Sequence, residues 1–223
     1  MSPSAPRHVV VVGGGISGLA AARFLRDEGD ADLRVTVLEG SPQVGGKIRV
    51  SDVAGVPVDE GAESLLLRRA EGTDLVDAVG LGEDLVHAAT TAASIWTRGS
   101  LRPIPAGTVM GVPTDLRALA ASELLTPAEL ARVPLDAWLP RTPVGEDVAV
   151  GRYVAARMGG AVVDRLVEPL LGGVYAGHAT LLSLDATLPQ LAPYVRRERS
   201  LLRAARASRG QAPPAPGPVF GSL

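Results

Sequence analysis

The strongest constraint on the fold lies near the N-terminus, where four consecutive valines, Val9–Val12, run directly into a glycine-rich turn. The turn reads Gly13-Gly14-Gly15-Ile16-Ser17-Gly18 and leads into an alanine-rich segment with helical spacing. A Gly-x-Gly-x-x-Gly sequence between a buried strand and a helix predicts a site for a dinucleotide pyrophosphate. The N-terminus of that helix would present free N–H groups to the phosphates. A glycine-rich turn without a ligand is the alternative.

The flanking sequence predicts a parallel strand–helix–strand unit. We expect strands over His8–Val12 and Arg34–Leu38, and a helix over Ile16–Glu28 that ends at Gly29. Glu39 follows the second strand, near the offset expected for the acid that binds a ribose. A carboxylate there accepts hydrogen bonds from the 2′- and 3′-hydroxyls and repels a 2′-phosphate, which argues against an NADP-type ligand. A solvated glutamate at the end of a strand is the alternative.

Two further clusters of small residues follow. Gly45-Gly46-Lys47 combines a glycine doublet with a cation, which allows backbone and side chain to approach phosphate or ribityl oxygens. Taken alone, it would be an ordinary turn. Lys47–Asp52 and Val56–Asp59 predict a hairpin around Ala54-Gly55. The small residues of Gly61-Ala62-Glu63-Ser64 close this unit and again suit a close backbone approach.

The remainder is predicted to be mostly helical. A short helix over Thr73–Val79, with Thr73 as its N-cap, precedes a hairpin over Ile95–Ile104. Helical spacing continues from Pro113, and Pro169 is expected to disrupt the helix that contains it. The candidate caps in this region are Thr114, Thr126 and Asp147, with Pro127 at a first helical position.

The last predicted helix, Leu191–Arg209, is rich in arginine. Such a helix could contact a membrane surface or an anionic ligand, or could simply present a solvated face. A Pro/Ala-rich, linker-like stretch follows over Gln211–Pro218. His8, His87 and His178 are scattered without ligand spacing, so no metal site is predicted.

Composition excludes several classes of protein. The chain has 223 residues, of which 46% are hydrophobic, and this is ample for a packed core. A net charge of −2 gives no electrostatic case for nucleic acid. The absence of cysteine excludes disulfides, thiolate metal sites and cysteine nucleophiles, and fits a reducing compartment. The N-terminal apolar run is too short for a signal peptide, and no apolar window is long enough to predict a transmembrane helix.

Taken together, these motifs resemble the flavin-dependent porphyrinogen oxidases of haem synthesis over essentially the whole chain. The signature of Gly13–Leu19, Glu39 and Gly45-Gly46-Lys47 is shared with the wider amine-oxidase and phytoene-desaturase superfamily and implies FAD. The more specific similarities are Pro105–Leu116 and, above all, Glu168–Gly177 followed by Leu182-Ser183-Leu184.

The resemblance implies an α/β fold with an FAD-binding Rossmann-like domain over residues 1–85. The start of a substrate domain would follow over 86–112, then a helical domain over 113–210, then a linker and a truncated strand over 211–223. The residues that it assigns to FAD are Gly13, Gly14, Gly15, Ile16, Ser17, Gly18, Glu39, Gly40, Gly45, Gly46, Lys47, Gly61, Ala62, Glu63 and Ser64.

The implied activity is the removal of hydrogen from a porphyrinogen in successive two-electron steps, with oxygen as the acceptor. The cysteine-free, alanine-rich sequence resembles the actinobacterial branch, which is thought to use coproporphyrinogen III rather than protoporphyrinogen IX; the choice between the two stays open. A cytoplasmic location is expected, and peripheral membrane contact stays open. No acid–base pair is assigned because the flavin carries the chemistry.

The sequence departs from the family at several positions. Gln43 stands where the family often has Arg, Val50 where it has Thr or Ser, and Ala93 where eukaryotic relatives have Arg. Family members are also about twice as long, and Pro218-Val219-Phe220 resembles the start of a strand that continues in them. We therefore expect an incomplete sequence. The alternatives are a flavin amine oxidase or carotenoid desaturase, and a non-catalytic remnant.

Overall fold

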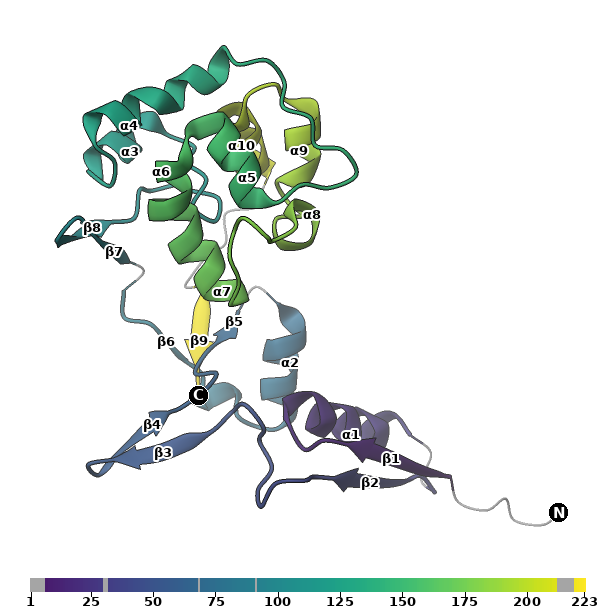
Figure 1. Ribbon diagram of the computed structural model, residues 1–223. Helices are drawn as coiled ribbons and strands as arrows, with labels where there is room; N and C mark the ends of the chain where they lie inside the picture. The colour runs from purple at the N-terminus through teal and green to yellow at the C-terminus, as the bar shows by residue number, and fades with distance from the viewer. Residues whose placement is uncertain (1–6, 30–31, 68, 91, 212–218) are drawn as a thin grey trace. The chain divides into compact units, whose positions relative to one another are not determined.

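The computed structural model describes residues 7–29, 32–67, 69–90, 92–211 and 219–223. The chain forms two compact units (Figure 1). Unit 1 contains residues 1–90 and 216–223, and unit 2 contains residues 91–215. The finer division predicted from the sequence, with boundaries at residues 85, 112 and 210, stays a prediction.

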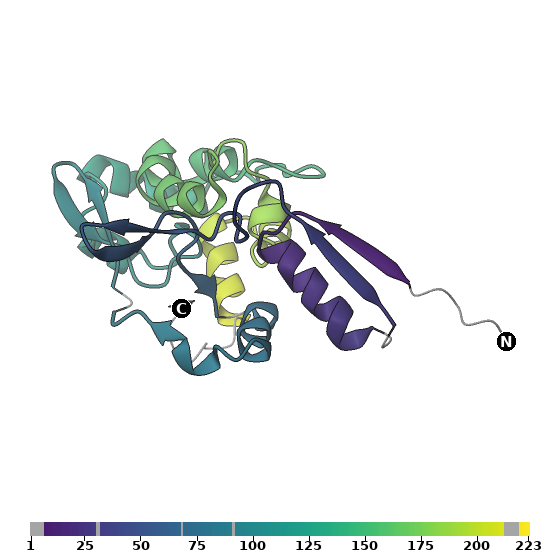
Figure 2. The same cartoon turned by 90° about the horizontal axis from the view of Figure 1, so that it is seen from below.

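Unit 1 begins with the predicted strand–helix–strand motif. Strand β1 (His8–Val12) pairs in parallel with β2 (Arg34–Leu38), and α1 (Ile16–Glu28) connects them. Figures 1 and 2 both show α1 lying along this strand pair. The helix ends at Gly29, where a Cβ would collide with the Leu25 carbonyl oxygen, so a side chain does not fit there. The prediction for this region is confirmed.

The rest of unit 1 consists of short elements. Strands β3 and β4 form the predicted antiparallel hairpin, which turns at Ala54 and Gly55 with positive φ angles of 54° and 85°. A three-stranded sheet has the order β5-β9-β6, so its central strand comes from the C-terminal end of the described chain. The bounds are β3 (Val50–Val53), β4 (Val56–Asp59), β5 (Leu65–Leu66), α2 (Ala70–Ala78), the 3-10 turn η1 (Gly82–Asp84), β6 (Val86–His87) and β9 (Phe220–Ser222).

Two predictions in unit 1 need comment. The N-cap prediction for Thr73 is wrong, because α2 begins a turn earlier and its N-cap is Arg69. The Thr73 hydroxyl instead donates to the Ala70 carbonyl inside the helix (3.1 Å), a bond that threonine can also make within a helix. The strand predicted to start at Pro218 corresponds to β9, although Pro218 itself lies outside the described residues.

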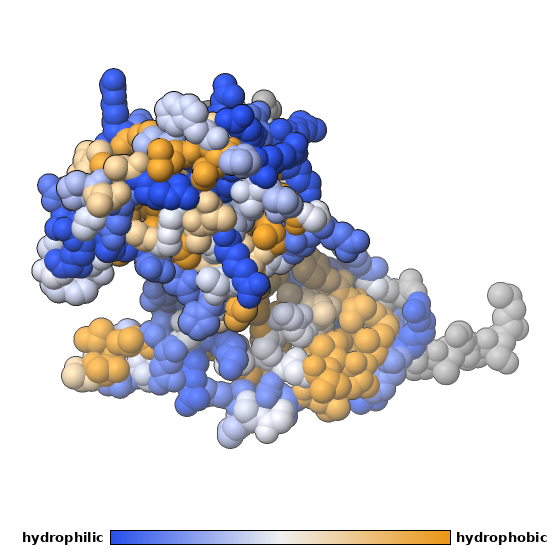
Figure 3. Space-filling view, turned by 45° about the horizontal axis from the view of Figure 1, so that its top comes forward, coloured by the Kyte–Doolittle hydropathy of each residue, from blue (hydrophilic) through white to orange (hydrophobic). Residues whose placement is uncertain are grey.

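Unit 1 has little core of its own. Among the described residues, Val76 is its one buried large hydrophobic side chain, whereas Val12 is 84% exposed. Figure 3 shows a broad apolar surface in orange over the region of β1, β2 and α1. Parallel strand pairs are normally covered on both faces, so this surface is a potential contact or aggregation site.

Unit 2 is largely helical. It starts with the predicted hairpin of β7 and β8, whose turn residues Arg98 and Gly99 have positive φ angles of 53° and 75°. Its elements are β7 (Ser94–Thr97), β8 (Ser100–Pro103), α3 (Leu116–Ala121), α4 (Pro127–Arg132), η2 (Val133–Ala137), α5 (Val150–Met158), α6 (Gly160–Val162), the π-helical η3 (Val163–Gly172), α7 (Gly173–Tyr175), α8 (Leu184–Thr187), α9 (Ala192–Arg197) and α10 (Leu201–Gln211). The core of this unit contains the fully buried side chains Leu119, Leu124, Met158, Leu166, Leu171, Leu184, Leu188, Leu191 and Leu201.

Only one of the three helix caps predicted in this region is found in the structure. Thr126 caps α4 as predicted, in a capping box with Glu129 and with Pro127 in the first turn. The cap predictions for Thr114 and Asp147 are wrong. Asp115 caps α3, while the buried Thr114 hydroxyl donates to the Gly107 carbonyl (2.5 Å). Asp147 accepts from the backbone N–H groups of residues 148 and 185 (2.8 and 3.3 Å), upstream of the α5 cap.

Two predicted helix boundaries are also wrong. Pro169 does not end its helix, because the chain continues through it as the π-helical segment η3, which does not use the α-helical hydrogen-bond pattern that proline interrupts. The predicted helix over Leu191–Arg209 is two helices, α9 and α10, separated by residues 198–200.

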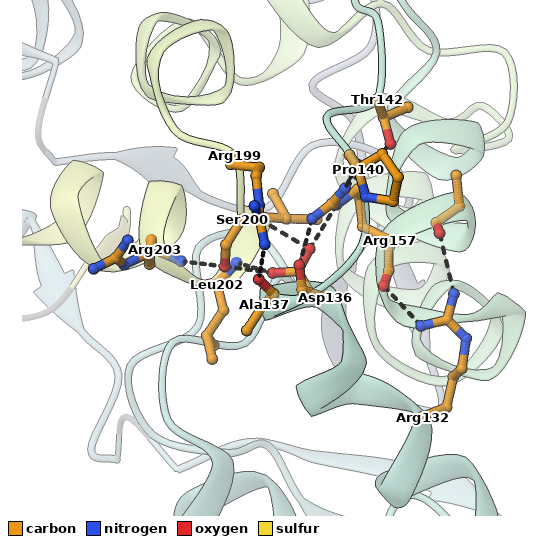
Figure 4. Close-up of polar contacts among 12 residues, drawn as sticks. Arg132, Asp136, Ala137, Pro140, Thr142, Arg157, Arg199, Ser200, Leu202 and Arg203 are labelled. Carbon is orange, nitrogen blue, oxygen red and sulfur yellow. Dashed lines mark hydrogen bonds and ion pairs between the residues drawn. The ribbon is translucent and has the colours of Figure 1, made fainter.

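A buried carboxylate explains this break. Asp136 accepts from the Arg157 guanidinium Nε (2.6 Å), from the Ser200 hydroxyl (2.6 Å) and from the N–H groups of residues 201 and 202 (3.1 and 2.9 Å). The side chains of Asp136 and Arg157 are 1% and 0% exposed. Figure 4 shows Arg157 of α5 and the residues at the start of α10 converging on Asp136 of η2. The first N–H groups of α10 are therefore satisfied by a residue of η2.

We expect Asp136→Asn to lower the free energy of unfolding by about 3–5 kcal/mol, because it leaves the buried Arg157 without its counter-charge. The matched control is Asp185→Asn, which removes a partly exposed ion pair with Arg196 and should cost about 0–1 kcal/mol. Urea unfolding followed by circular dichroism measures both. Equal losses in the two variants would contradict the structural role of Asp136.

The capping box predicts a pH dependence. The Thr126 N–H, with further hydrogen bonds from Thr126 and Arg165, lowers the pKa of Glu129 from 4.5 to about 2, although partial burial opposes the shift. Because the pKa is lower in the folded state, the stabilisation is present above pH 4.5 and is lost as the pH falls towards 2. The stability difference between the native sequence and Glu129→Gln should therefore shrink over this range in parallel urea titrations. A pH-independent difference would be inconsistent with this pKa.

Candidate functional site

The glycine-rich turn joins β1 to α1 in a conformation that side chains would block. Gly13 has a φ of +104°, and its N–H donates to the Leu38 carbonyl of β2 (2.7 Å). At Gly18, a Cβ would collide with the Gly13 carbonyl oxygen, so the first turn of α1 rests directly on the loop. Within the described residues, no side chain caps α1 and its first turn contains no acid. No side chain therefore competes with an anion for its first N–H groups.

The Glu39 carboxylate is bonded directly to this turn. Its Oε2 accepts from the Gly14 N–H and its Oε1 from the Ser41 N–H, both at 2.7 Å. The Ser41 and Gly14 N–H groups lower the pKa of Glu39, which therefore stays ionised at neutral pH. An exposed carboxylate is held next to the N-terminus of α1, with lone pairs remaining for further donors.

The second glycine cluster packs against the first. The Gly45 N–H donates to the Gly14 carbonyl (2.8 Å), and a Cβ added to Gly46 would lie 3.0 Å from the Gly15 Cα. Gly45 and Gly46 have φ angles of +119° and +61°, which favour glycine. The two backbones approach each other more closely than larger residues would allow.

The third cluster of small residues, Gly61-Ala62-Glu63-Ser64, divides into two parts. Gly61 lies against Lys47, whose carbonyl oxygen would collide with a Cβ on Gly61 and accepts from the Ala62 N–H (3.2 Å). Gly61 and Ala62 are thus linked to the second cluster. Within the described chain, no hydrogen bond connects Glu63 or Ser64 to the glycine turns; the Glu63 carbonyl accepts from the Ser222 hydroxyl (2.6 Å).

A cavity of about 490 Å³ opens beside Glu39. The residues that line it are Glu39, Ser41, Pro42, Gln43, Val44, Gly46, Lys47, Ile48 and Arg49. Ser41 and Arg49 were not predicted as site residues. Ser41 contributes a backbone N–H to Glu39, which no residue-type pattern reveals, and Arg49 is paired with Glu60 (3.1 Å) across the hairpin.

The histidines, for which the sequence predicts no site, lie away from the glycine clusters or in unit 2. His8 contacts the Thr36 hydroxyl (2.9 Å), and His178 contacts Glu168 (3.0 Å) in unit 2. No cluster of metal-ligating side chains is found in the part of the chain that the structure describes. Within that same part, every helix is too short or too polar to cross a membrane.

The arrangement suits a nucleotide-containing cofactor. A helix N-terminus without its own cap can bind phosphate oxygens, and an ionised carboxylate beside it can accept from ribose hydroxyls. Positive φ angles and close backbone contacts keep side chains out of the space over the turn. The geometry therefore fits the phosphate and ribose parts of FAD.

Comparison with known proteins supports this chemistry. A sequence model of the flavin containing amine oxidoreductase family matches residues 16–215. Coproporphyrinogen III oxidase of Bacillus subtilis is 37% identical over 92% of this chain and 44% of its own length. The Mycobacterium tuberculosis H37Rv protein of the same name is 40% identical over 98% of this chain and 48% of its own. The chain thus spans about half the length of the curated relatives it matches.

Solved structures with a similar fold support the same family. A crystal structure from Exiguobacterium sp. 255-15, provisionally named a protoporphyrinogen oxidase, has a TM-score of 0.81 at 38% identity and covers 97% of this chain and 47% of its own. Putrescine oxidase is similar in fold alone, with a TM-score of 0.56 at 18% identity over 97% of this chain and 45% of its own. The predicted α/β, FAD-binding fold of the amine-oxidase type is confirmed. The chain belongs to the flavin-containing amine oxidoreductases, a family of FAD-dependent enzymes.

Proposed function

We propose that this chain supplies the FAD phosphate and ribose site of an enzyme that oxidises coproporphyrinogen III to coproporphyrin III in haem biosynthesis. The observation that carries the proposal is the 36–41% identity to relatives named coproporphyrinogen III oxidase. The Arabidopsis thaliana relative named protoporphyrinogen oxidase 1 is 35% identical over only 79% of the chain. We prefer coproporphyrinogen III as the substrate because relatives of that name reach 40% identity over 98% of the chain. Protoporphyrinogen IX, which the names of the Arabidopsis and Exiguobacterium proteins suggest, is the second candidate.

In this proposal, the N–H groups at the start of α1 bind the pyrophosphate of FAD. Gly13, Gly15 and Gly18 keep the approach open, and Glu39 accepts from the adenosine ribose. Gly45–Lys47 and Gly61–Ala62 form the adjoining wall, with Glu63 and Ser64 further along the chain. Bound FAD would accept the electrons of the substrate in two-electron steps. We further propose oxygen as the final acceptor, and a cytoplasmic location with or without peripheral membrane contact.

The role of Glu39 is testable in the chain as it stands. We expect Glu39→Gln to weaken FAD binding by about tenfold, because a charged acceptor is lost at the ribose. Quenching of flavin fluorescence during a titration with protein measures the dissociation constant. The control is Glu28→Gln, which removes the same charge from an exposed position in unit 1 that forms no ion pair within the described residues. Equal affinity of the two variants would argue against the ribose role.

Substrate specificity needs a complete enzyme around this chain. We would join it to the remainder of the Mycobacterium tuberculosis relative and follow porphyrin fluorescence and oxygen consumption. The fusion should form coproporphyrin III in an FAD-dependent reaction, and faster than it forms protoporphyrin IX. The matched variant Gly18→Val should abolish FAD binding and turnover, since a side chain there meets the Gly13 carbonyl. A folded, flavin-loaded fusion that oxidises putrescine but neither porphyrinogen would refute the proposed substrate class.

A further inference from the structure

Unit 2 contains a second cavity that the proposed oxidase site does not use. It has a volume of about 730 Å³ and lies between the start of α3 and the end of α10. The residues that line it are Thr114, Asp115, Leu116, Arg117, Arg206, Arg209 and Gly210. Three of these seven residues carry a guanidinium group, and one carries a carboxylate. None of the lining residues belongs to the glycine turns of unit 1.

The cavity carries a net positive charge, because three guanidinium groups and one carboxylate line it. Arg157, Arg165 and Arg196 of the same unit are each paired with an acid. Within the residues that the structure describes, none of the three cavity arginines forms an ion pair. The carboxylate of Asp115 is engaged instead in capping α3, where it accepts from the N–H groups of residues 117 and 118 (2.7 and 3.4 Å).

Two of the arginines lie against the backbone of the segment before α3. The Arg206 Nε donates to the Thr114 carbonyl (2.6 Å), which leaves its two terminal nitrogens for another acceptor. The Arg209 guanidinium lies over Gly107, where a Cβ would collide with its Nη1. Gly107 has a φ of +79° and accepts the Thr114 hydroxyl through its carbonyl. One buried threonine therefore fixes both the loop under Arg209 and the acceptor for Arg206.

The helical spacing of Arg206 and Arg209 places their guanidinium groups close together. Arg206 and Arg209 are three residues apart on α10 and so lie on the same face of the helix. Arg117 reaches the same cavity from α3. Guanidinium forks match the oxygen geometry of phosphate, and several forks around one space favour a group with more than one negative charge.

We propose that Arg117, Arg206 and Arg209 form a binding site for a phosphate group. The cavity is larger than inorganic phosphate, so the group would be carried by a larger molecule, either a soluble phosphate ester or an anionic phospholipid headgroup. This site is additional to the proposed oxidation and is independent of it.

Isothermal titration of the 223-residue chain with glycerol 3-phosphate, at constant ionic strength, tests the proposal. The variant Arg117→Gln/Arg209→Gln removes two side chains that make no hydrogen bond within the described chain, so it should fold normally. We expect saturable binding that weakens by about tenfold or more in this variant. The control, Arg152→Gln/Arg197→Gln, removes the same charge from exposed positions of unit 2 and should bind like the native sequence. Arg206→Gln is a second, independent variant with the same expected loss.

Co-sedimentation with phosphatidylcholine vesicles, with and without phosphatidylglycerol, distinguishes the two sources of phosphate. Binding of the ester without vesicle binding assigns a soluble ligand. Vesicle binding that needs phosphatidylglycerol and is lost in Arg117→Gln/Arg209→Gln, but not in the control, assigns a lipid headgroup. The proposal is overturned if neither probe binds, or if cavity and control variants lose binding equally. FAD affinity, measured in parallel, should be unchanged in every one of these variants. Loss of FAD binding in unit 1 can therefore be distinguished from loss of phosphate binding in unit 2.

Discussion

The hydrogen bond from the Gly14 N–H to the Glu39 carboxylate is the interaction on which the candidate cofactor site depends. It ties the turn after β1 to the residue after β2, two points that are close only because the strands are parallel and in register. Glycine at position 14 is part of this contact, since a Cβ there would lie 3.0 Å from the Glu39 Oε2. The same carboxylate orders Ser41 and borders the cavity. A single ionised side chain thus links the glycine turn, the segment after β2 and the cavity.

The two units differ in what holds them together. Unit 2 has a continuous apolar core and the buried Asp136–Arg157 pair, which fixes η2, α5 and the start of α10. Unit 1 is organised by backbone contacts among glycines and by short strand pairs, with much apolar surface exposed. A ligand that binds only the folded form stabilises that form by mass action. FAD would therefore contribute to the stability of unit 1 far more than to that of unit 2.

Local patterns predicted much of unit 1. The run of valines, the glycine spacing and the offset to Glu39 each reflect neighbouring residues along the chain, and β1, α1 and β2 match their predicted bounds. The wrong predictions concern positions where contacts between residues distant in the sequence determine the structure. The break between α9 and α10 depends on Asp136, which lies 64 residues before Ser200 in the sequence. Thr114 is a buried residue of the arginine cavity and does not cap a helix, because its hydroxyl donates to the Gly107 carbonyl. No periodicity encodes such contacts.

We have proposed that the glycine turns of unit 1 bind FAD. The most direct measurement is a proton–nitrogen correlation spectrum of the chain, labelled selectively at glycine, during titration with FAD. We expect the largest chemical-shift changes at the glycines of the two turns, with the glycines of unit 2 nearly unchanged. The glycines concerned are Gly13, Gly14, Gly15, Gly18, Gly45 and Gly46. Saturating FAD that shifts only glycines of unit 2, or none, would contradict it.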